Sequence, residues 1–328
     1  MNDEICMRWE KIDIGFLCAG DEAFRISTGI VPERLLSSIA KVGILHPIWV
    51  KSFAEGSVSY LVVLGYSRFD AARSIGIESI PCLVVDETTS DADLFLANIY
   101  DNLSSRELNI LEQATALKKS EHYLGREKTL TDIMPAIGLK PSPRLLERML
   151  DLLALPAPVQ DAISQGDISS TCALFLPRLE ENEQLAFLSV VKKLKPGVNV
   201  QREFLEYLNE CARRGEESIL ELLEKPPLKE ILSDESKPTA ECIAHFRAAL
   251  HRLRYPHLAA CEETFNRFIH SLRLPPEVTL EAPAFFEGSE FRLEVRFHSP
   301  EDLLQRLKKI SDSFSSHEVQ KAFISTMP

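Results

Sequence analysis

The sequence predicts an α+β protein of three domains: a small mixed α/β domain at residues 1–100, an all-α helix-turn-helix domain at 101–224, and a small α+β domain at 239–328. Three observations lead to this prediction. The 328 residues exceed what one ordinary hydrophobic core requires. Short apolar strands alternate with helical patterns in the first hundred residues, and short helices joined by tight turns follow. A proline-rich stretch at 225–238 predicts a linker before the last domain.

The composition is typical of a folded protein, with 45% hydrophobic and 26% charged residues. No stretch approaches the roughly 20 apolar residues that span a bilayer, and residues 1–4 lack the basic start of a signal peptide. We therefore expect a cytoplasmic protein without membrane contact. The cysteines are far apart and form no C-x-x-C pair, which favours reduced thiols over disulfides or a metal site: Cys6, Cys18, Cys82, Cys172, Cys211, Cys242 and Cys261.

The charge is distributed unevenly along the chain. A net charge of -12 argues against a protein coated with basic residues for sequence-blind binding to nucleic acid. Between residues 117 and 151, however, the basic residues outnumber the acidic ones. This locally positive segment is where we expect a contact with nucleic acid.

The first domain alternates helix and strand patterns. A helix begins at Pro32 and ends at Gly43, and a short strand follows at 48–50. We expect a loop at 52–59, a second strand at 60–64, a helix at 67–75 ended by Gly76, and a third strand at 80–85.

A glycine turn joins the second strand to the helix that follows it. Gly65 comes directly after the apolar run 60–64, and Ser67 and Arg68 lie at the start of the helix. Such a turn can direct backbone N–H groups and the positive end of the helix at a phosphate, and an arginine can bind the same anion. The plainer alternative is an ordinary strand-to-helix turn with a surface arginine.

The second domain has the pattern of a DNA-binding helical bundle. We expect helices at 91–100 and 109–124, with a polar break at 102–105, to bridge the first two domains. After Gly125 a helical series follows, with a helix at 131–137, a turn at 138–141, and helices at 143–153, 157–164 and 169–179. The helix that begins at Pro143 would lie in the major groove, with its polar N-terminal residues nearest the bases. The candidate DNA-binding residues are Lys140 on phosphate and, reading or flanking the bases, Ser142, Arg144, Glu147 and Arg148.

The alternative is a helical bundle with a solvated charged face and no DNA. Pro135 and Pro141 are unusual inside a helix-turn-helix, and Glu147 would repel phosphate.

In the third domain the sequence pattern predicts helices at 239–253 and 257–272, strands at 277–282 and 290–297, and a helix at 300–310. Its hairpin core is predicted from apolar residues in and around the strands: Leu280, Phe285, Phe286, Phe291, Leu293, Val295 and Phe297.

Several blocks of the sequence resemble the ParB family of partition proteins, whose N-terminal domain shares its fold with sulfiredoxin. An arginine at Arg25 precedes S-I-x-x-x-G-x-x-x-P at 38–47, then G-x-x-R-x-x-A-A at 65–72 and Ile80-Pro81. Residues 101–114 resemble the family's E-N-x-x-R-E-x-L-N-P-x-E-x-A stretch, and residues 152–169 resemble its helix-turn-helix domain. The resemblance implies a pocket for CTP, with Mg²⁺, formed by Arg25, Gly43, Gly65, Ser67, Arg68 and Asn102.

The departures from the family pattern fall on charged positions. Tyr66 and Ser67 stand where the family has a glutamate and an arginine. Asp101, Ser105 and Arg106 stand for a glutamate, an arginine and a glutamate. A pocket without those carboxylates has a weaker general base or metal partner, so we expect at most weak CTP hydrolysis.

The resemblance therefore predicts a DNA-binding protein of chromosome or plasmid partition, or of related regulation, that CTP binding switches. It also implies a homodimer formed through the C-terminal domain, association with the nucleoid and a partner partition ATPase. One alternative is a nucleotide-dependent enzyme of the same fold, either a small-molecule kinase or a nuclease. Sulfiredoxin chemistry is disfavoured because Ser67 stands where that enzyme needs a cysteine. Another alternative is a transcriptional regulator that binds no nucleotide.

Overall fold

The structure is a computed structural model, and it describes residues 7–18, 22–28, 31–55, 58–288 and 290–315. The chain divides into two compact units, residues 1–192 and 193–328. The sequence predicts three domains, at 1–100, 101–224 and 239–328. These bounds differ from the two units and remain a prediction.

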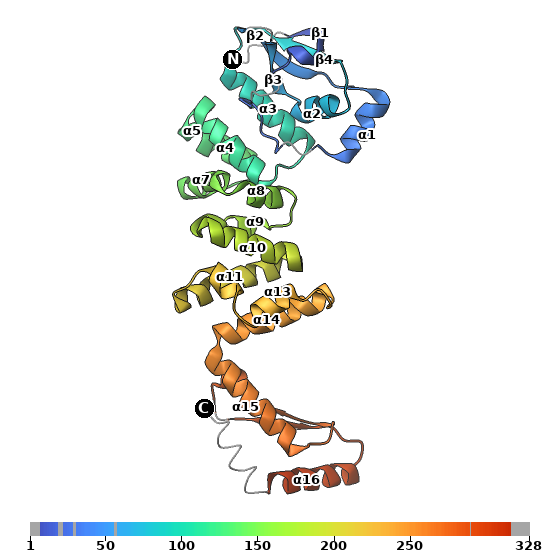
Figure 1. The fold of residues 1–328 in the computed structure, drawn as a ribbon, viewed down its shortest axis with the longest axis vertical. Coiled ribbons are helices and arrows are strands. Elements are labelled where there is room, and N and C mark those ends of the chain that lie inside the picture. The colour runs from blue at the N-terminus through green and yellow to red at the C-terminus, as the bar shows by residue number, and fades with distance from the viewer. Residues whose placement is uncertain (1–6, 19–21, 29–30, 56–57, 289, 316–328) are drawn as a thin grey trace. The chain divides into compact units, whose positions relative to one another are not determined.

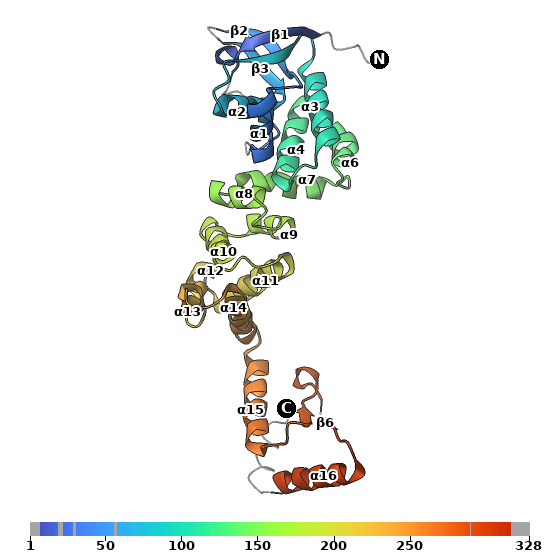
Figure 2. The same cartoon turned by 90° about the vertical axis from the view of Figure 1, so that its right-hand side faces the viewer.

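The first unit begins with a four-stranded sheet in the order β1-β4-β2-β3. Strand β1 is antiparallel to β4, β4 is parallel to β2, and β2 is antiparallel to β3. Three helices, α1, α2 and α3, lie on the same side of this sheet (Figures 1 and 2). The elements are β1 (Met7–Asp13), α1 (Glu33–Val42), β2 (Ile48–Glu55), β3 (Val58–Leu64), α2 (Tyr66–Ser74), β4 (Ser79–Val85) and α3 (Asp91–Ser105).

One strand of the sheet was missed by the sequence analysis, and the prediction for one loop is wrong. Strand β1 was not predicted, because Ile12 is its single buried residue and no apolar run marks it. The loop predicted at 52–59 is largely strand, since β2 continues to Glu55 and pairs there with Val58 of β3. Residues 56 and 57, with Gly56 of the predicted loop, lie outside the described residues.

Helix α3 is longer than the sequence pattern indicates. The polar break predicted at 102–105 is absent, and the helix ends at Ser105. The hydroxyl groups of Ser104 and Ser105 donate hydrogen bonds to carbonyl oxygens of the same helix, at Asp101 and Asn102. Polar side chains that would favour a loop are therefore satisfied on the last turn of the helix.

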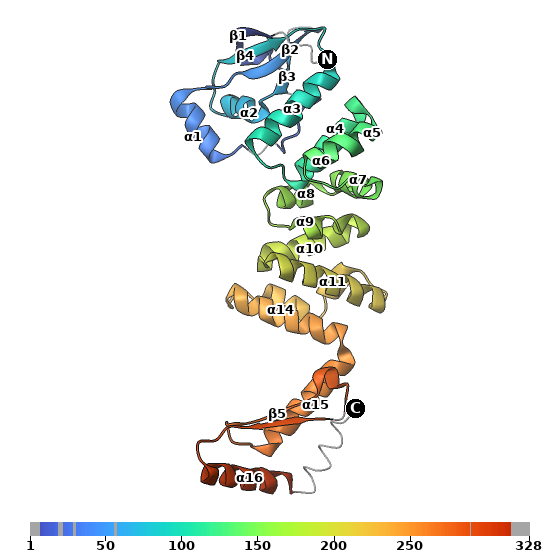
Figure 3. The same cartoon turned by 180° about the vertical axis from the view of Figure 1, so that it is seen from behind.

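Helix α4 (Ile110–Leu124) follows α3 in the sequence and packs beside it (Figure 3). A continuous helical run follows Gly125, made of α5 (Arg126–Lys128), the π-helical stretch η2 (Thr129–Ile133) and α6 (Met134–Ala136). The predicted helix at 131–137 thus begins five residues earlier, at 126. The π-helical stretch accommodates Pro135. The N–H of Met134 bonds to the carbonyl of Thr129, so the backbone hydrogen bonds have already changed from the α-helical pattern before Pro135, which has no N–H to donate.

Helix α7 packs on α4 after a turn at Gly138, whose φ of +80° suits glycine. It covers Pro143–Leu150 and buries Leu146 and Met149. The helix predicted to 153 ends at Leu150, and the 3-10 turn η3 (Asp151–Ala154) follows. Helix α8 (Ala157–Ser164) has its predicted bounds, whereas the helix predicted at 169–179 is split into α9 (Ser170–Ala173) and η4 (Leu176–Arg178). Helix α10 (Glu181–Leu194) crosses the bound between the two units.

The second unit consists of helices followed by a two-stranded sheet. The predicted linker at 225–238 contains a helix, α13, because Leu228 is completely buried and anchors that segment. The elements are α11 (Val198–Gly215), α12 (Ile219–Leu223), α13 (Leu228–Ser233), α14 (Thr239–Arg254), α15 (Pro256–Leu272), β5 (Val278–Glu281), β6 (Arg292–Val295) and α16 (Pro300–Phe314).

The predicted hairpin core of this unit is correct for only some of its residues. Leu280 and Phe286 are buried in a cluster with side chains of α15, and Phe291 packs against that cluster. Phe285, Leu293 and Phe297 were predicted in the core but are exposed, by 75%, 41% and 51%. A two-stranded sheet covers one helix with one face only, so the other face of the hairpin stays in water.

In the part of the chain that the structure describes, no helix combines the length and the apolar character needed to cross a membrane. Six cysteines lie in that part and all are free thiols; Cys6 lies outside it. The described residues contain no cluster of three or more metal-binding side chains.

Candidate functional site

A cavity of about 600 Å³ opens in the first unit at the first turn of α2. The end of α3, the residues before β2 and one side chain of α4 also contribute to its wall. Its lining joins polar groups with an apolar part formed by Pro32, Leu35, Trp49 and Leu83. A cavity of this size, with a few converging polar groups and an apolar wall, is typical of a site for a small ligand.

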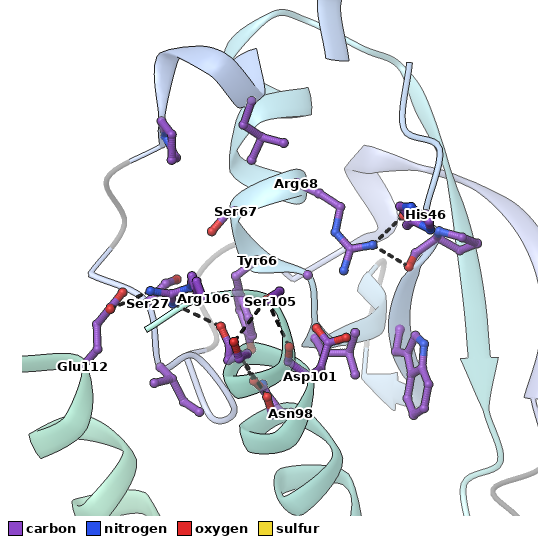
Figure 4. Close-up of a pocket in the computed structure, with 18 of the residues that line it drawn as sticks. Ser27, His46, Tyr66, Ser67, Arg68, Asn98, Asp101, Ser105, Arg106 and Glu112 are labelled. Atoms are coloured by element: carbon purple, nitrogen blue, oxygen red, sulfur yellow. Dashed lines mark hydrogen bonds and ion pairs between the residues drawn. The ribbon is translucent and has the colours of Figure 1, made fainter. Parts of the chain in front are cut away.

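The first turn of α2 forms one side of the cavity. Gly65 is the N-cap, with φ +93°, and a β-carbon there would lie 2.8 Å from Ile48 Cγ2. The side chains of Ile48 and Arg68 already occupy that corner, so the turn fits there only because Gly65 has no β-carbon. Ser67 and Arg68 lie on this turn beside the cavity (Figure 4). The positive end of a helix at this point favours a bound anion.

Arg68 is fixed on the loop before β2. Its Nη1 donates to the carbonyl oxygens of His46 at 2.6 Å and Pro47 at 3.0 Å. Burial lowers the pKa of Arg68, and the nearby carboxylate of Asp101 opposes this shift. The guanidinium therefore holds the loop in place while its charge faces the cavity.

A chain of hydrogen bonds runs along the other side of the cavity. Asn98 is 1% exposed and donates to the carbonyl oxygens of Phe24, at 2.8 Å, and Val63. Asn102 Nδ2 donates to Asn98 Oδ1 at 2.7 Å. Arg106 completes the chain, because its Nη2 donates to Asn102 Oδ1 at 3.1 Å.

Arg106 also connects the cavity to α4. Its Nη1 lies 2.6 Å from Glu112 Oε2, and the Glu112 side chain is only 5% exposed. The same carboxylate accepts the N–H of Asn109 at 3.0 Å in the capping box that begins α4. The dashed lines of Figure 4 show Arg106 between Glu112 and α3.

The structure brings four of the six predicted nucleotide-binding residues to this cavity: Gly65, Ser67, Arg68 and Asn102. The other two, Arg25 and Gly43, are not in its lining. Gly43 ends α1 with φ +74°. Sequence reasoning did not propose the apolar side chains or Asn98 as part of the site, because strands and helices distant in the sequence bring them together.

Arg25 is engaged inside the fold. It forms two hydrogen bonds with Asp70, at 2.7 and 3.0 Å, and lies over the ring of Tyr66 at 4.7 Å. The hydrogen bond to Asp70 raises the pKa of Arg25. Arg25 therefore holds α2, which carries Tyr66 and Asp70, against the segment before α1.

The predicted DNA-binding residues form a partly exposed group around α7. Lys140 and Arg144 are exposed. Ser142 is the N-cap of α7, and its hydroxyl accepts the N–H of Leu145 at 3.3 Å. This capping contact uses one lone pair and leaves the hydroxyl hydrogen for another partner.

Glu147 and Arg148, at the other end of α7, each have an internal partner. Glu147 Oε1 lies 2.9 Å from Arg126 Nη2, and both side chains are about half exposed or more. Arg148 Nη2 donates to the carbonyl of Leu174 at 3.3 Å, and its Nε is buried without a partner. Arg144 thus faces water, whereas Arg148 is partly packed against the next helical segment.

Part of the first unit is similar to a known family of domains. Residues 32–102 match the model of the ParB N-terminal domain. A probable chromosome-partitioning protein ParB of Mycobacterium leprae is 31% identical over 171 residues, which are 52% of this chain and 50% of that protein. The chromosome-partitioning protein ParB of Caulobacter vibrioides is 30% identical over 138 residues, 42% of this chain and 43% of that protein. These alignments are longer than residues 32–102, so the similarity extends beyond the N-terminal domain.

The chain spans about half the length of the curated relatives it matches. Among solved structures, C-terminally truncated ParB from Caulobacter crescentus complexed with CTP-gamma-S is 26% identical, covers 53% of this chain and 94% of that chain, and has a TM-score of 0.26. The same protein complexed to the centromeric parS site is 23% identical, covers 58% and 96%, and has a TM-score of 0.33.

Proposed function

We propose, on the premise that this is a ParB-like chain with a ParB N-terminal domain at residues 32–102, that it is a DNA-binding protein of chromosome or plasmid partition whose state depends on bound CTP. The observation that carries the proposal is the coincidence of this domain with the cavity, since most of the cavity lining falls within residues 32–102. The proposed domains are a nucleotide-binding domain at 1–100, a DNA-binding domain at 101–224 and a dimerisation domain at 239–328.

The nucleotide would bind with its phosphates at the first turn of α2. Gly65, Ser67, Arg68 and Asn102 contact it in this proposal, while Arg25 and Gly43 act from outside the lining by holding α2 and α1. The apolar wall with Trp49 and Leu83 suits the base or the sugar. Mg²⁺ would accompany the phosphates, and Asp101 is the carboxylate beside Arg68 that could bind it. Weak hydrolysis at most is expected.

DNA would bind along α7. Arg144 is the exposed candidate for reading bases and Lys140 the exposed candidate for a phosphate contact. Ser142, Glu147 and Arg148 flank the site, with Arg126 offsetting the charge of Glu147. Helix α7 packs on α4, and α4 supplies Glu112 to the cavity, so one helix contacts both proposed sites.

The remaining partners follow from the same proposal. Exposed apolar side chains of the second unit, among them Phe297 and Leu304, suit contact with a second copy of the chain. A partition ATPase and association with the nucleoid in the cytoplasm belong to the proposal as properties expected of a partition protein.

The test is fluorescence anisotropy of labelled duplexes with the full chain, over a range of salt concentrations and with or without CTP and Mg²⁺. The duplexes are one of random sequence and one selected by the protein from a randomised pool. Lys140→Ala should weaken binding to both duplexes and reduce the slope of log K against log salt by roughly 1. Arg144→Ala should cost about 1–3 kcal/mol on the selected duplex and relax its preference over the random one.

Arg8→Ala is the matched control, because Arg8 is exposed on β1 and lies outside both sites. Failure of the wild-type chain to bind any duplex at low salt would overturn the proposal. Consumption of nucleotide with a small-molecule acceptor, without duplex binding, would instead support an enzyme. DNA binding that no nucleotide affects would support a nucleotide-free regulator.

A further inference from the structure

The positive and negative side chains that line the cavity are equal in number, and a bound nucleotide would add negative charge to them. Two arginines, Arg68 and Arg106, line it among the described residues, and two carboxylates, Asp101 and Glu112, lie beside them. A nucleoside triphosphate brings several negative charges into this space. An arginine that can leave its carboxylate partner for phosphate would strengthen the binding of such a ligand.

Arg68 is poorly placed for such an exchange. Its Nη1 is committed to two main-chain carbonyl oxygens, at 2.6 and 3.0 Å. Moving this group would leave both carbonyl oxygens of the loop at 46–47 without this donor, and the loss is costly at Pro47, where the bond is partly buried. Arg68 therefore contributes its positive charge from its present position and does not move towards the ligand.

Arg106 is well placed for it. Its side chain is 35% exposed, and it follows the last residue of α3, so it is not held inside a helix. Its partner Glu112 keeps the N–H of Asn109 as a donor when Arg106 leaves, because that bond at 3.0 Å belongs to the capping box. Asn102 likewise keeps its own hydrogen bonds to Asn98.

We propose that Arg106 is a phosphate-binding residue of this cavity and that it exchanges the carboxylate of Glu112 for the terminal phosphates of the nucleotide. The inference rests on the proposed function, since it concerns the same ligand. Arg106 would supply a positive charge to the phosphates. Ser67 and Ser105, which also line the cavity, are uncharged and cannot supply it. The exchange leaves Glu112 of α4 without its cation, so ligand binding acts directly on the first turn of that helix.

The test compares affinities along a phosphate series by isothermal titration calorimetry. The ligands are cytidine tri-, di- and monophosphate with Mg²⁺, and the adenosine series serves for the base. Arg106→Ala should weaken triphosphate binding about 10- to 100-fold, as expected for loss of a charge-assisted bond, and monophosphate binding by less than about 3-fold. Arg106→Lys should recover part of the triphosphate affinity.

Glu112→Gln tests the exchange itself. Glutamine can replace glutamate in a capping box, so the start of α4 is retained while the competing charge is removed. This variant should bind the triphosphate several-fold more tightly than the wild type. Arg73→Ala is the control, because Arg73 is exposed on the last turn of α2 and outside the lining.

The outcomes separate the two proposals. If the wild type binds the triphosphate and Arg106→Ala binds it like Arg73→Ala, or loses the mono- and triphosphate equally, the role of Arg106 is overturned and the nucleotide-dependent function stands. Weaker triphosphate binding by a folded Glu112→Gln would also overturn the exchange. If the wild type binds no member of either series, the nucleotide part of the proposed function fails, and this inference fails with it.

Discussion

Asn98 is the side chain whose hydrogen bonds connect the cavity to the sheet. Its amide donates to two backbone carbonyl oxygens, of Phe24 and Val63, and its own oxygen accepts from Asn102. At 1% exposure, none of these groups has water as an alternative partner. A residue that resembles an ordinary polar position on a helix therefore determines how α3 docks on β3.

Asn98→Ala should lower the free energy of unfolding by about 1–3 kcal/mol, because two buried carbonyl groups lose their donor. Urea denaturation of the full chain, followed by circular dichroism, measures the change. Ser104→Ala is the control, since Ser104 is exposed on the same helix and should change stability by less than about 0.5 kcal/mol. If the two substitutions lowered the free energy of unfolding equally, the buried hydrogen bonds of Asn98 would contribute no more to stability than the exposed hydrogen bond of Ser104.

Cys82 lies in the middle of β4 and is completely buried. Burial disfavours the charged thiolate and raises the pKa of Cys82 to about 12. At pH values below the usual cysteine pKa the thiol is protonated in both folded and unfolded chains, so it does not affect how stability depends on pH. Above that value the unfolded chain loses a proton that the folded chain keeps, and stability falls as the pH rises towards 12.

A thiol reagent at about pH 8 should therefore leave Cys82 unmodified in the native chain while it modifies Cys18, which is only half-buried. Peptide mapping by mass spectrometry identifies the labelled positions. Unfolding in urea should make the two cysteines react alike. Labelling of native Cys82 at the rate of Cys18 would mean that β4 opens far more readily than its burial indicates.

At the scale of elements, the turn between β3 and α2 is the most constrained part of the site. Gly65 and Gly76 flank α2, and both have positive φ, of 93° and 74°. A β-carbon at Gly65 would meet Ile48 Cγ2 at 2.8 Å, whereas one at Gly76 would have no neighbour within 4 Å. The two glycines thus share backbone strain but differ in crowding.

Gly76→Ala should cost about 1–2 kcal/mol, the price of a left-handed conformation for an L residue. Gly65→Ala should cost about 1–3 kcal/mol more, because β2 or α2 must also move to relieve the contact. Thermal and urea unfolding of the two variants give the difference. Since the crowded corner borders the cavity, Gly65→Ala should also weaken nucleotide binding; equal stabilities would show that the turn relaxes freely.

Local signals in the sequence predict some of these elements well. Helices α1 and α8 follow from apolar periodicity and their end residues, and Gly65, Ser67 and Arg68 follow from one strand-to-helix motif. Edge strand β1 could not be predicted in this way, because pairing with β4 rather than burial defines it. The predicted break in α3 failed since side-chain hydroxyls satisfy its last carbonyl groups.

The candidate site shows the same division between local and distant information. Asn102 belongs to a motif that can be read along the chain, whereas the ion pair between Arg106 and Glu112 depends on how α3 and α4 meet. Trp49 and Leu83 come to the cavity from paired positions on β2 and β4. Contacts set by strand register and helix packing are absent from any short sequence window, so this part required the structure.

At the scale of the whole molecule, the second unit leaves several large apolar side chains exposed near its last helix. Leu304 and Leu307 of α16 are 67% and 44% exposed, and Phe297 before that helix is 51% exposed. Ile310 is the one described residue of α16 that is buried. A helix that buries so little of its apolar face in its own chain is typical of an element that packs against another copy.

We therefore expect the full chain to be a dimer in solution and the double substitution Leu304→Ser with Leu307→Ser to make it a monomer. Analytical ultracentrifugation over a range of concentrations measures the mass, and urea unfolding of the same samples measures stability. Leu220→Ser, at an exposed leucine of α12 in the same unit, is the control and should leave the mass unchanged. Because Leu304 and Leu307 are exposed within one chain, the monomeric variant should keep its fold at low concentration, where the wild type also dissociates. A loss of stability at every concentration without a change of mass would mean instead that this face of α16 packs inside its own chain.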